Sequence, residues 1–150
     1  MSQVNNPEQS LPHHIRGAFR GFETALSRYL ATIGLPLSQF YILRLQWDER
    51  GHQQSYIADK SCMSESVASQ VIQKMEKAGL IERKLDPEDS RKLRVVLTPQ
   101  GKALREEVVI TGIQLSKKHT PDISREDMLL TIAVLIKVKK AFDDFNAEHS

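Results

Sequence analysis

The chain contains a single cysteine, Cys62, and no long apolar segment. One cysteine cannot form an internal disulfide, which is typical of a protein kept in a reducing compartment. No apolar run approaches the roughly 20 residues of a membrane-spanning helix, and the polar N-terminus lacks the basic and apolar regions of a signal peptide. We therefore expect a cytoplasmic protein that does not contact a membrane.

Motifs of catalysis and of metal binding are also absent. The sequence has no glycine-rich phosphate loop, no GxSxG nucleophile motif and no carboxylate pair whose spacing singles it out, so we expect neither an enzyme nor a cofactor. A metal site is not expected either, because the histidines lack the HxxxH or metal-finger spacing. They are His13, His14, His52, His119 and His149.

Charge of one sign is not in excess. The chain has 21 Lys and Arg against 19 Asp and Glu, a net charge of +2, so total charge gives no argument for nucleic-acid binding. Basic residues do concentrate between positions 70 and 94. Such a cluster is as typical of a solvated face as of a DNA-binding surface. Its members are Lys74, Lys77, Arg83, Lys84, Arg91, Lys92 and Arg94.

What the sequence does contain is helical periodicity on the scale of one domain of 150 residues. Residues 1–11 are polar and expected to be disordered. A long helix is predicted over 12–33, a second from about 37 with Phe40, Leu43 and Trp47 on one face, and a short third over 55–60. Thr98-Pro99 and Ser124 begin two further helices. The last carries an apolar stripe of Met128, Ile132, Leu135, Val138, Phe142 and Phe145.

Residues 56–79 predict a helix-turn-helix. Ser64 is a suitable N-cap for its second helix, Ala58 is small enough for the helix crossing, and Gly79 can end the unit. The facing sides are apolar at Ile57, Ala68 and Val71. The outer side suits major-groove reading by short polar side chains, although a plain solvent face explains it equally well. It consists of Ser64, Ser66, Val67, Ser69, Gln70, Gln73 and Lys74.

Two strand-like runs, 80–85 and 93–97, follow immediately and flank a turn-rich loop, which predicts a hairpin. A helix-turn-helix followed by a basic hairpin is typical of a winged helix. We expect Arg91 and Lys92 to be DNA-binding residues of this wing, with Arg91 reaching the minor groove. An Asp89–Arg91 salt bridge is expected to hold the loop, or else to be an ordinary surface pair.

The runs LPLSQF from Leu35, MSESVASQVIQKMEKAGLIER from Met63, DPEDSR from Asp86 and LTPQG from Leu97 resemble the MarR family of bacterial regulators. The resemblance covers roughly 35–104. It implies a mainly helical fold, with a winged helix at about 37–98 and dimerisation helices at about 12–33 and 99–148, within one domain over 12–150. It also implies a homodimer on a pseudo-palindromic DNA operator, acting as a repressor that a small molecule releases.

Two positions depart from the family pattern. Gln70 stands where many relatives carry arginine, which affects the operator sequence and the phosphate contacts. Cys62 stands at a turn position often given to glycine, so the turn must either avoid positive φ or tolerate strain. Its place before a helix N-terminus allows either a redox-active thiol or an inert small residue.

The resemblance also implies an effector pocket between the dimerisation helices and the winged helix. A planar acid, such as an aromatic carboxylate, would need aromatic walls and a cationic anchor. Periodicity equally explains the aromatic residues as core and the arginines as solvated. The candidates are His14, Arg16, Arg20, Phe40, Tyr41, Arg44 and Trp47.

Two functions other than regulation agree with the same pattern. The winged helix could bind a protein partner, in which case rising salt should not weaken binding steeply. It could also be an architectural protein that binds DNA without sequence preference, against which the small net charge argues.

Overall fold

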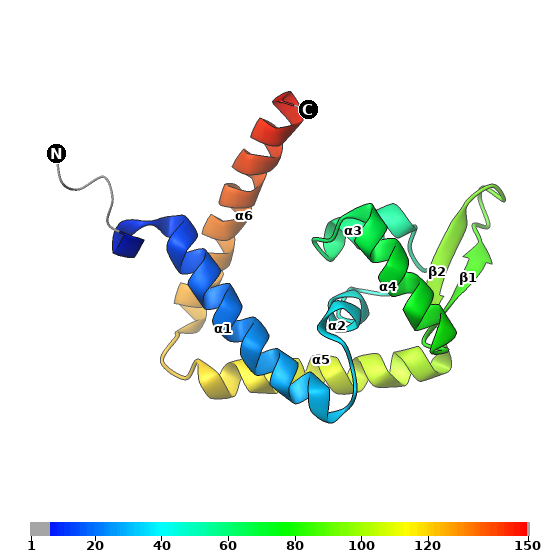
Figure 1. Cartoon of the computed structure of the whole chain (residues 1–150), viewed down its shortest axis with the longest axis horizontal. Coiled ribbons are helices and arrows are strands. Elements are labelled where there is room, and N and C mark those ends of the chain that lie inside the picture. Colours follow the sequence, from blue (N-terminus) through cyan, green and yellow to red (C-terminus); the bar gives the residue numbers. More distant parts are fainter. Residues whose placement is uncertain (1–6, 150) are drawn as a thin grey trace. The chain divides into compact units, whose positions relative to one another are not determined.

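The computed structural model describes residues 7–149 of the chain. Helices make up most of this part, and an antiparallel hairpin is the only sheet in it (Figure 1). The predicted fold class, mainly helical with a two-stranded wing, is confirmed. In chain order the elements are the 3-10 helix η1 (Pro7–Gln9), α1 (Leu11–Thr32), α2 (Leu37–Leu43), α3 (Gln54–Lys60), α4 (Glu65–Lys77), β1 (Ile81–Leu85), β2 (Leu93–Leu97), α5 (Pro99–His119) and α6 (Arg125–Glu148).

The chain divides into two compact units, Met1–Gly112 and Ile113–Ser150, with the boundary inside α5. Among the described residues, the buried hydrophobic side chains all belong to the first unit, from Leu26 to Val108. Helix α6, in the second unit, contains no buried residue. The single domain expected over 12–150 stays a prediction.

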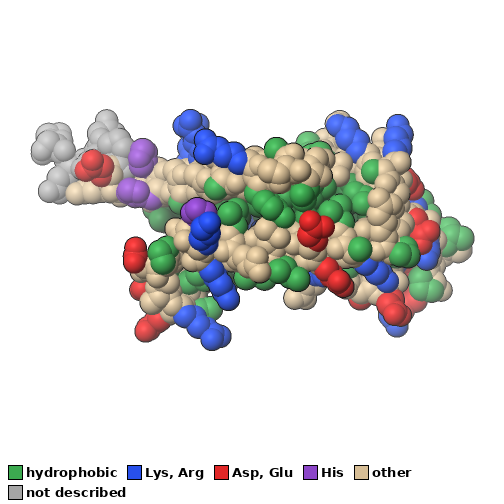
Figure 2. Space-filling view, turned by 90° about the horizontal axis from the view of Figure 1, so that it is seen from below, with side chains coloured by type: hydrophobic (Ala, Val, Ile, Leu, Met, Phe, Trp, Pro, Cys, Tyr) green, Lys and Arg blue, Asp and Glu red, His purple; other side chains and the backbone are tan. Residues whose placement is uncertain are grey.

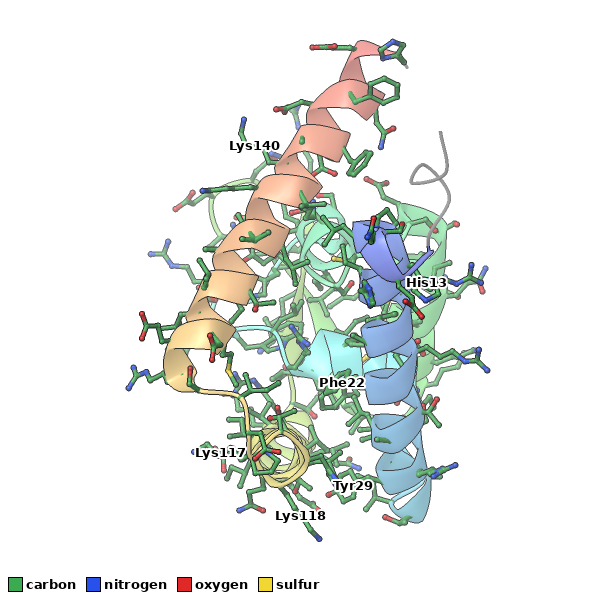
Figure 3. The ribbon with its side chains drawn as sticks, turned by 90° about the vertical axis from the view of Figure 1, so that its left-hand side faces the viewer. His13, Phe22, Tyr29, Lys117, Lys118 and Lys140 are labelled. Atoms are coloured by element: carbon green, nitrogen blue, oxygen red, sulfur yellow. The ribbon has the colours of Figure 1, made fainter. Side chains whose placement is uncertain are left out.

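Many large apolar side chains remain exposed. On the face shown in Figure 2, hydrophobic groups lie among charged groups of both signs. Phe22 and Tyr29 project from the same side of α1 (Figure 3), and Phe22 is 39% exposed. The exposed apolar residues of α6 are Met128, Leu129, Leu130, Ile132, Val134, Leu135, Ile136, Phe142 and Phe145.

The N-terminal segment expected to be disordered, 1–11, is described only from Pro7 onward. From there the chain forms η1 over Pro7–Gln9, and α1 begins at Leu11. The Nε2 atom of His14 lies 2.7 Å from the carbonyl oxygen of Glu8, which joins η1 to the first turn of α1. Residues 1–6 lie outside the described part of the chain.

Helix α2 is shorter than predicted. It ends at Leu43, whereas the spacing of Phe40, Leu43 and Trp47 predicted a helix that reaches Trp47. The carbonyl of Ile42 instead accepts two bonds of 3.2 Å, from the indole N–H of Trp47 and from the backbone N–H of Leu45. Because these donors satisfy the helix end, the chain continues as a loop.

Helices α3 and α4 form the predicted helix-turn-helix. The turn between them is closed by the N–H of Met63, which donates to the carbonyl of Ala58 over 2.9 Å, as in a Schellman motif. Ser64 then caps α4, and its Oγ accepts the N–H of Val67 at 3.3 Å. The side chains predicted to face inward, Ile57, Ala68 and Val71, are buried, and Ile72 and Met75 continue the same buried face of α4.

Strands β1 and β2 form the predicted wing. They pair antiparallel with Ile81 opposite Leu97 and Leu85 opposite Leu93. His52, from the loop before α3, forms an isolated antiparallel bridge with Val95. This bridge fastens the base of the wing to the helix-turn-helix.

Cys62 occupies the left-handed position of the α3–α4 turn, with φ of 55°, so of the two alternatives the turn tolerates strain. Gly34 and Gly79 hold the corresponding positions after α1 and α4, with φ of 68° and 71°. A left-handed L-residue costs about 1–2 kcal/mol, and the greater unfolded-state entropy of glycine offsets about 0.5–1 kcal/mol of that. We expect Cys62→Gly to stabilise the protein by up to about 1 kcal/mol in urea unfolding. Cys62→Ala is the control, and an equal gain there would attribute the effect to the thiol.

Candidate DNA-binding surface and ligand cleft

The outer face of α4 presents short polar side chains to solvent. Val67 is 45% exposed, and Ser69 is half-buried. Such small side chains let a helix approach base edges closely, and a glutamine amide can bond adenine at two points. The exposure expected of these residues is observed, while their contacts with DNA remain a prediction. The exposed polar members are Ser64, Ser66, Gln70, Gln73 and Lys74.

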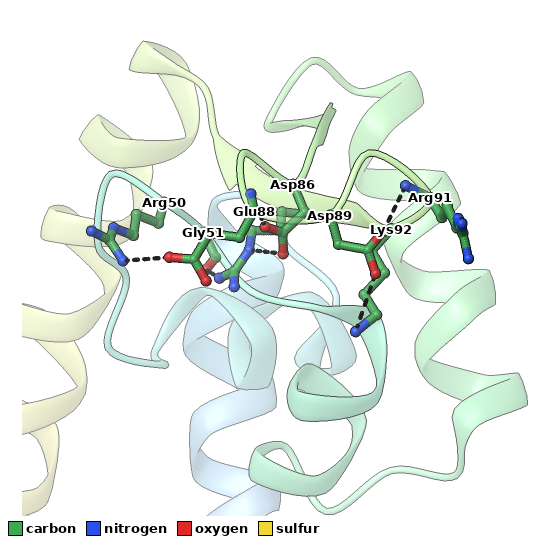
Figure 4. Close-up of polar contacts among 8 residues, drawn as sticks. Arg50, Gly51, Asp86, Glu88, Asp89, Arg91 and Lys92 are labelled. Atoms are coloured by element: carbon green, nitrogen blue, oxygen red, sulfur yellow. Dashed lines mark hydrogen bonds and ion pairs between the residues drawn. The ribbon is translucent and has the colours of Figure 1, made fainter.

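The wing loop holds Arg91 and Lys92 exposed, but the predicted Asp89–Arg91 salt bridge is wrong (Figure 4). One carboxylate oxygen of Asp89 accepts the backbone N–H of Arg91 at 3.1 Å, and the other lies 3.5 Å from Nζ of Lys92. An aspartate readily bonds the backbone two residues later in a turn. The Arg91 guanidinium is therefore left to solvent.

Sequence reasoning missed two residues at the base of the loop. Asp86, 5% exposed, is the only buried charged residue in the described part of the chain. Its carboxylate accepts the N–H of Glu88 at 2.9 Å and Nε of Arg94 at 2.5 Å. The hydrophobic pattern of the sequence does not predict the Asp86–Arg94 pair, because each of the two residues taken alone is typical of an exposed surface position.

These contacts make the protein sensitive to acid. The Glu88 N–H and then the Arg94 guanidinium lower the pKa of Asp86 below its ordinary value. A lowered folded-state pKa stabilises the fold above the unfolded value, about 3.9, and this contribution is lost as the pH falls through the folded value. We expect stability measured by urea unfolding from pH 6 to pH 3 to fall less in Asp86→Asn than in the parent. Equal slopes would show that Asp86 is not the responsible group.

A cleft of about 350 Å³ opens in the first unit beside α1, α2 and the α3–α4 turn. Cations and one carboxylate share it with apolar groups, so it combines the aromatic walls and charged anchors expected of a site for a planar acid. Arg44 lies over the Tyr41 ring, with Cζ 5.8 Å from the ring centroid. The lining residues are Phe19, Glu23, Tyr41, Arg44, Lys60, Ser61, Cys62 and Met63.

Tyr41 is held as a neutral hydrogen-bond donor in this cleft. Its hydroxyl donates to Oε1 of Glu23 at 3.1 Å. Burial, and then the Glu23 carboxylate, raise the pKa of Tyr41 to about 12. The cleft therefore offers a phenol donor beside a carboxylate on one side and the Arg44 guanidinium on the other.

Of the predicted effector residues, the structure brings only Tyr41 and Arg44 into this cleft. Phe40 is buried, 5% exposed, and Trp47 lines a different hollow beside Lys102 and Arg105. The other candidates are exposed on α1 and do not line the cleft, namely His14, Arg16 and Arg20. Sequence reasoning missed Phe19 and Glu23, although their spacing of four places both on one face of a helix.

Residues 7–149 provide neither a cluster of metal-binding side chains nor a membrane-spanning helix. No group of three or more His, Cys, Asp or Glu side chains could hold a metal ion there. No helix in that part is long and apolar enough to cross a membrane.

An exposed polar recognition helix followed by a basic wing defines a winged helix-turn-helix DNA-binding protein. Residues 35–93 match the model of the MarR family. The chain is 22% identical over 129 residues to the transcriptional regulator HosA of Escherichia coli O111:H-, covering 86% of this chain and 94% of that one. Over residues 35–93 the chain is therefore similar to the MarR family, and its matched relatives, HosA among them, are transcriptional regulators.

Solved structures agree on the fold. BpsR of Bordetella bronchiseptica, described with regulation of its DNA binding by 6-hydroxynicotinic acid, matches with a TM-score of 0.79 and 21% identity over 90% of this chain and 96% of BpsR. CouR of Rhodococcus jostii RHA1, bound to p-coumaroyl-CoA, matches with a TM-score of 0.80 and 19% identity over 90% of this chain and 95% of CouR. At these identities the likeness shows the fold alone.

Proposed function

We propose that the chain is a cytoplasmic, homodimeric repressor that binds a pseudo-palindromic DNA operator and is released by a small molecule. One observation carries the proposal: α4 exposes a polar face within the same unit as a wing that exposes Arg91 and Lys92. Two such units on a dyad can read two half-sites one helical turn apart. The similarity of residues 35–93 to the MarR family supports the same interpretation.

We propose the cleft beside Tyr41 as the effector site and a hydroxylated aromatic carboxylate as the effector class. Arg44 can anchor a carboxylate. The Glu23 carboxylate already accepts a hydrogen bond from the Tyr41 hydroxyl, so a hydroxyl group of the ligand can donate to the same carboxylate. The compound that regulates DNA binding by BpsR, 6-hydroxynicotinic acid, and the compound bound to CouR, p-coumaroyl-CoA, are both aromatic, which supports this class.

The test is selection of bound DNA from a random pool, followed by release of that DNA with a panel of small aromatic acids. We expect one enriched palindromic sequence, affinity that falls steeply with salt, and release by at least one hydroxylated acid. Arg44→Met should weaken release, while Arg28→Met, an exposed arginine on α1 outside the cleft, should not. Binding without enrichment would favour an architectural protein, and no binding would reject the proposal.

A homodimer is expected because α6 buries none of its residues. An isolated helix with so many exposed apolar groups is unstable in water. In a symmetric dimer, the second copy of the chain would bury these groups. We expect light scattering to give a dimer at micromolar concentration and Leu135→Glu to give monomers. Lys137→Glu, on the opposite side of α6, is the control. A monomeric parent chain would contradict the prediction.

A further inference from the structure

Arg94 makes contacts on both sides of the boundary between the wing and the rest of the winged helix. Its side chain is 24% exposed, and that of its partner Asp86 is 4% exposed. While Nε donates to Asp86, Nη1 donates to the carbonyl of Gly51 at 3.0 Å, 43 residues earlier in the chain. One guanidinium thus joins the wing loop to the segment before α3.

The Gly51 end of this link is rigid. A Cβ built on Gly51 would lie 2.2 Å from the carbonyl oxygen of Val95, so the backbone passes directly against β2. The next residue, His52, donates its N–H to Val95 over 2.9 Å and accepts the N–H of Val95 over 2.8 Å. The carbonyl that Arg94 contacts therefore has little freedom to move.

The Asp86 end reaches the DNA-facing loop. The N–H of Asp86 donates to the carbonyl of Lys92 over 2.9 Å and closes the loop at its base. Lys92 donates in turn to the carbonyl of Asp89, whose side chain holds the N–H of Arg91 (Figure 4). A continuous series of polar contacts thus runs from Gly51 to the backbone of Arg91.

We propose that Arg94 and Asp86 are positioning residues for the wing, which set where Arg91 lies without themselves touching DNA. The proposal rests on the proposed DNA binding. Beyond these contacts and the exposed Arg50–Glu88 ion pair the loop has little support from the rest of the fold, because most of its side chains are exposed. A loop ordered before binding loses less entropy on binding, so its anchor raises affinity.

Arginine is suited to this position. Its planar fork donates in two directions at once, toward the Asp86 carboxylate and toward the Gly51 carbonyl, whereas lysine offers a single point of charge. Arg94→Lys should therefore keep the charge but lose one of the two contacts. Arg94→Leu should lose both and leave a buried carboxylate without its partner.

The first arm of the test measures the wing without DNA. Hydrogen exchange of the Arg91 and Lys92 amides should be faster in Arg94→Lys and faster still in Arg94→Leu than in the parent. The matched controls are Arg50→Lys and Arg50→Leu. Nη1 of Arg50 lies 3.7 Å from the carboxylate of Glu88, which belongs to the wing loop, but the Arg50 side chain is 71% exposed. Its loss should therefore leave the amide exchange unchanged. Unchanged exchange in both Arg94 variants would overturn the proposal.

The second arm uses the selected operator. We expect Arg94→Leu to weaken operator binding roughly 30-fold or more, as Arg91→Ala does, because the wing no longer holds Arg91 in place, and to show the same salt slope as Arg91→Ala. Protection of the minor groove should disappear while methylation protection of the major groove remains. Adding Arg91→Ala to Arg94→Leu should weaken operator binding little further. A salt slope below that of Arg91→Ala, or losses of binding free energy that add in the double variant, would make Arg94 a DNA contact instead.

The two arms separate the two proposals. If the parent chain binds no selected DNA, the regulator function fails while the exchange arm still tests the anchor. If the parent binds DNA and both Arg94 variants bind as well as it does, the anchor fails alone. Should Arg94→Leu not fold, Arg94→Lys gives the same comparisons.

Discussion

Replacing Arg91 with alanine is expected to weaken operator binding by about 2–6 kcal/mol per dimer, roughly 30-fold or more, because two wings each lose a groove contact of about 1–3 kcal/mol. Arg91 is exposed, and Asp89 holds its backbone and not its guanidinium. That side chain can therefore enter a narrow minor groove without first breaking an ion pair. Binding isotherms on the selected operator measure the loss.

The fold should not change in this variant. Substitutions on an exposed loop usually alter stability by less than about 0.5 kcal/mol, so the unfolding midpoint should stay that of the parent. Asp89→Ala should weaken binding less, since it frees the Arg91 N–H and Lys92 but leaves the guanidinium in place. Arg28→Ala, which removes an exposed arginine from α1, is the control. Undiminished binding by Arg91→Ala would show that the wing does not use this residue.

The elements that the sequence predicted well are those with a strong local signal. The Ser64 cap and the spacing of Ala68, Val71 and Met75 predicted α4, and the structure has both. Turn residues between two strand-like runs predicted the wing in the same way. Such signals depend on residues within one or two turns of each other, so the sequence displays them directly.

Where the prediction went wrong, contacts between distant segments decide the structure. Trp47 donates its indole N–H back to the end of α2 and ends that helix, although its apolar spacing indicated a continuing one. The wing is held by Arg94 through Gly51, which lies 43 residues away. Local spacing favoured the nearer pair, Asp89 and Arg91, and so led to the wrong ion pair.

The cleft was predicted only in part for the same reason. Tyr41 in α2 and Arg44 at its C-cap are three residues apart and were identified together, whereas Glu23 and Cys62 come from other segments and meet them only in the fold. The Glu23 contact with the Tyr41 hydroxyl changes what the cleft can bind. No spacing within the sequence indicates a contact between residues on two different helices.

On α4, Gln70→Ala is expected to relax base preference at one or two positions in each half-site, by about 1–3 kcal/mol each, and to leave affinity for random DNA nearly unchanged. Gln70 is exposed on the second turn after the Ser64 cap, on the face that carries Ser66. Its amide can donate and accept at once, which suits an adenine edge. Gln46→Ala, an exposed glutamine outside α4, is the control.

Lys74→Ala should behave differently, because it lies one turn further along the same face, in the last turn of α4, where the helix leaves the groove. A lysine there neutralises phosphate whatever the base sequence, so its loss should weaken all DNAs alike and lower the salt slope by about one per protomer. The experiment is a set of isotherms for both variants on operator and scrambled DNA at several salt concentrations. Equal losses on both DNAs for Gln70→Ala would reject its role in base reading. An unchanged salt slope for Lys74→Ala would place that residue away from the phosphates.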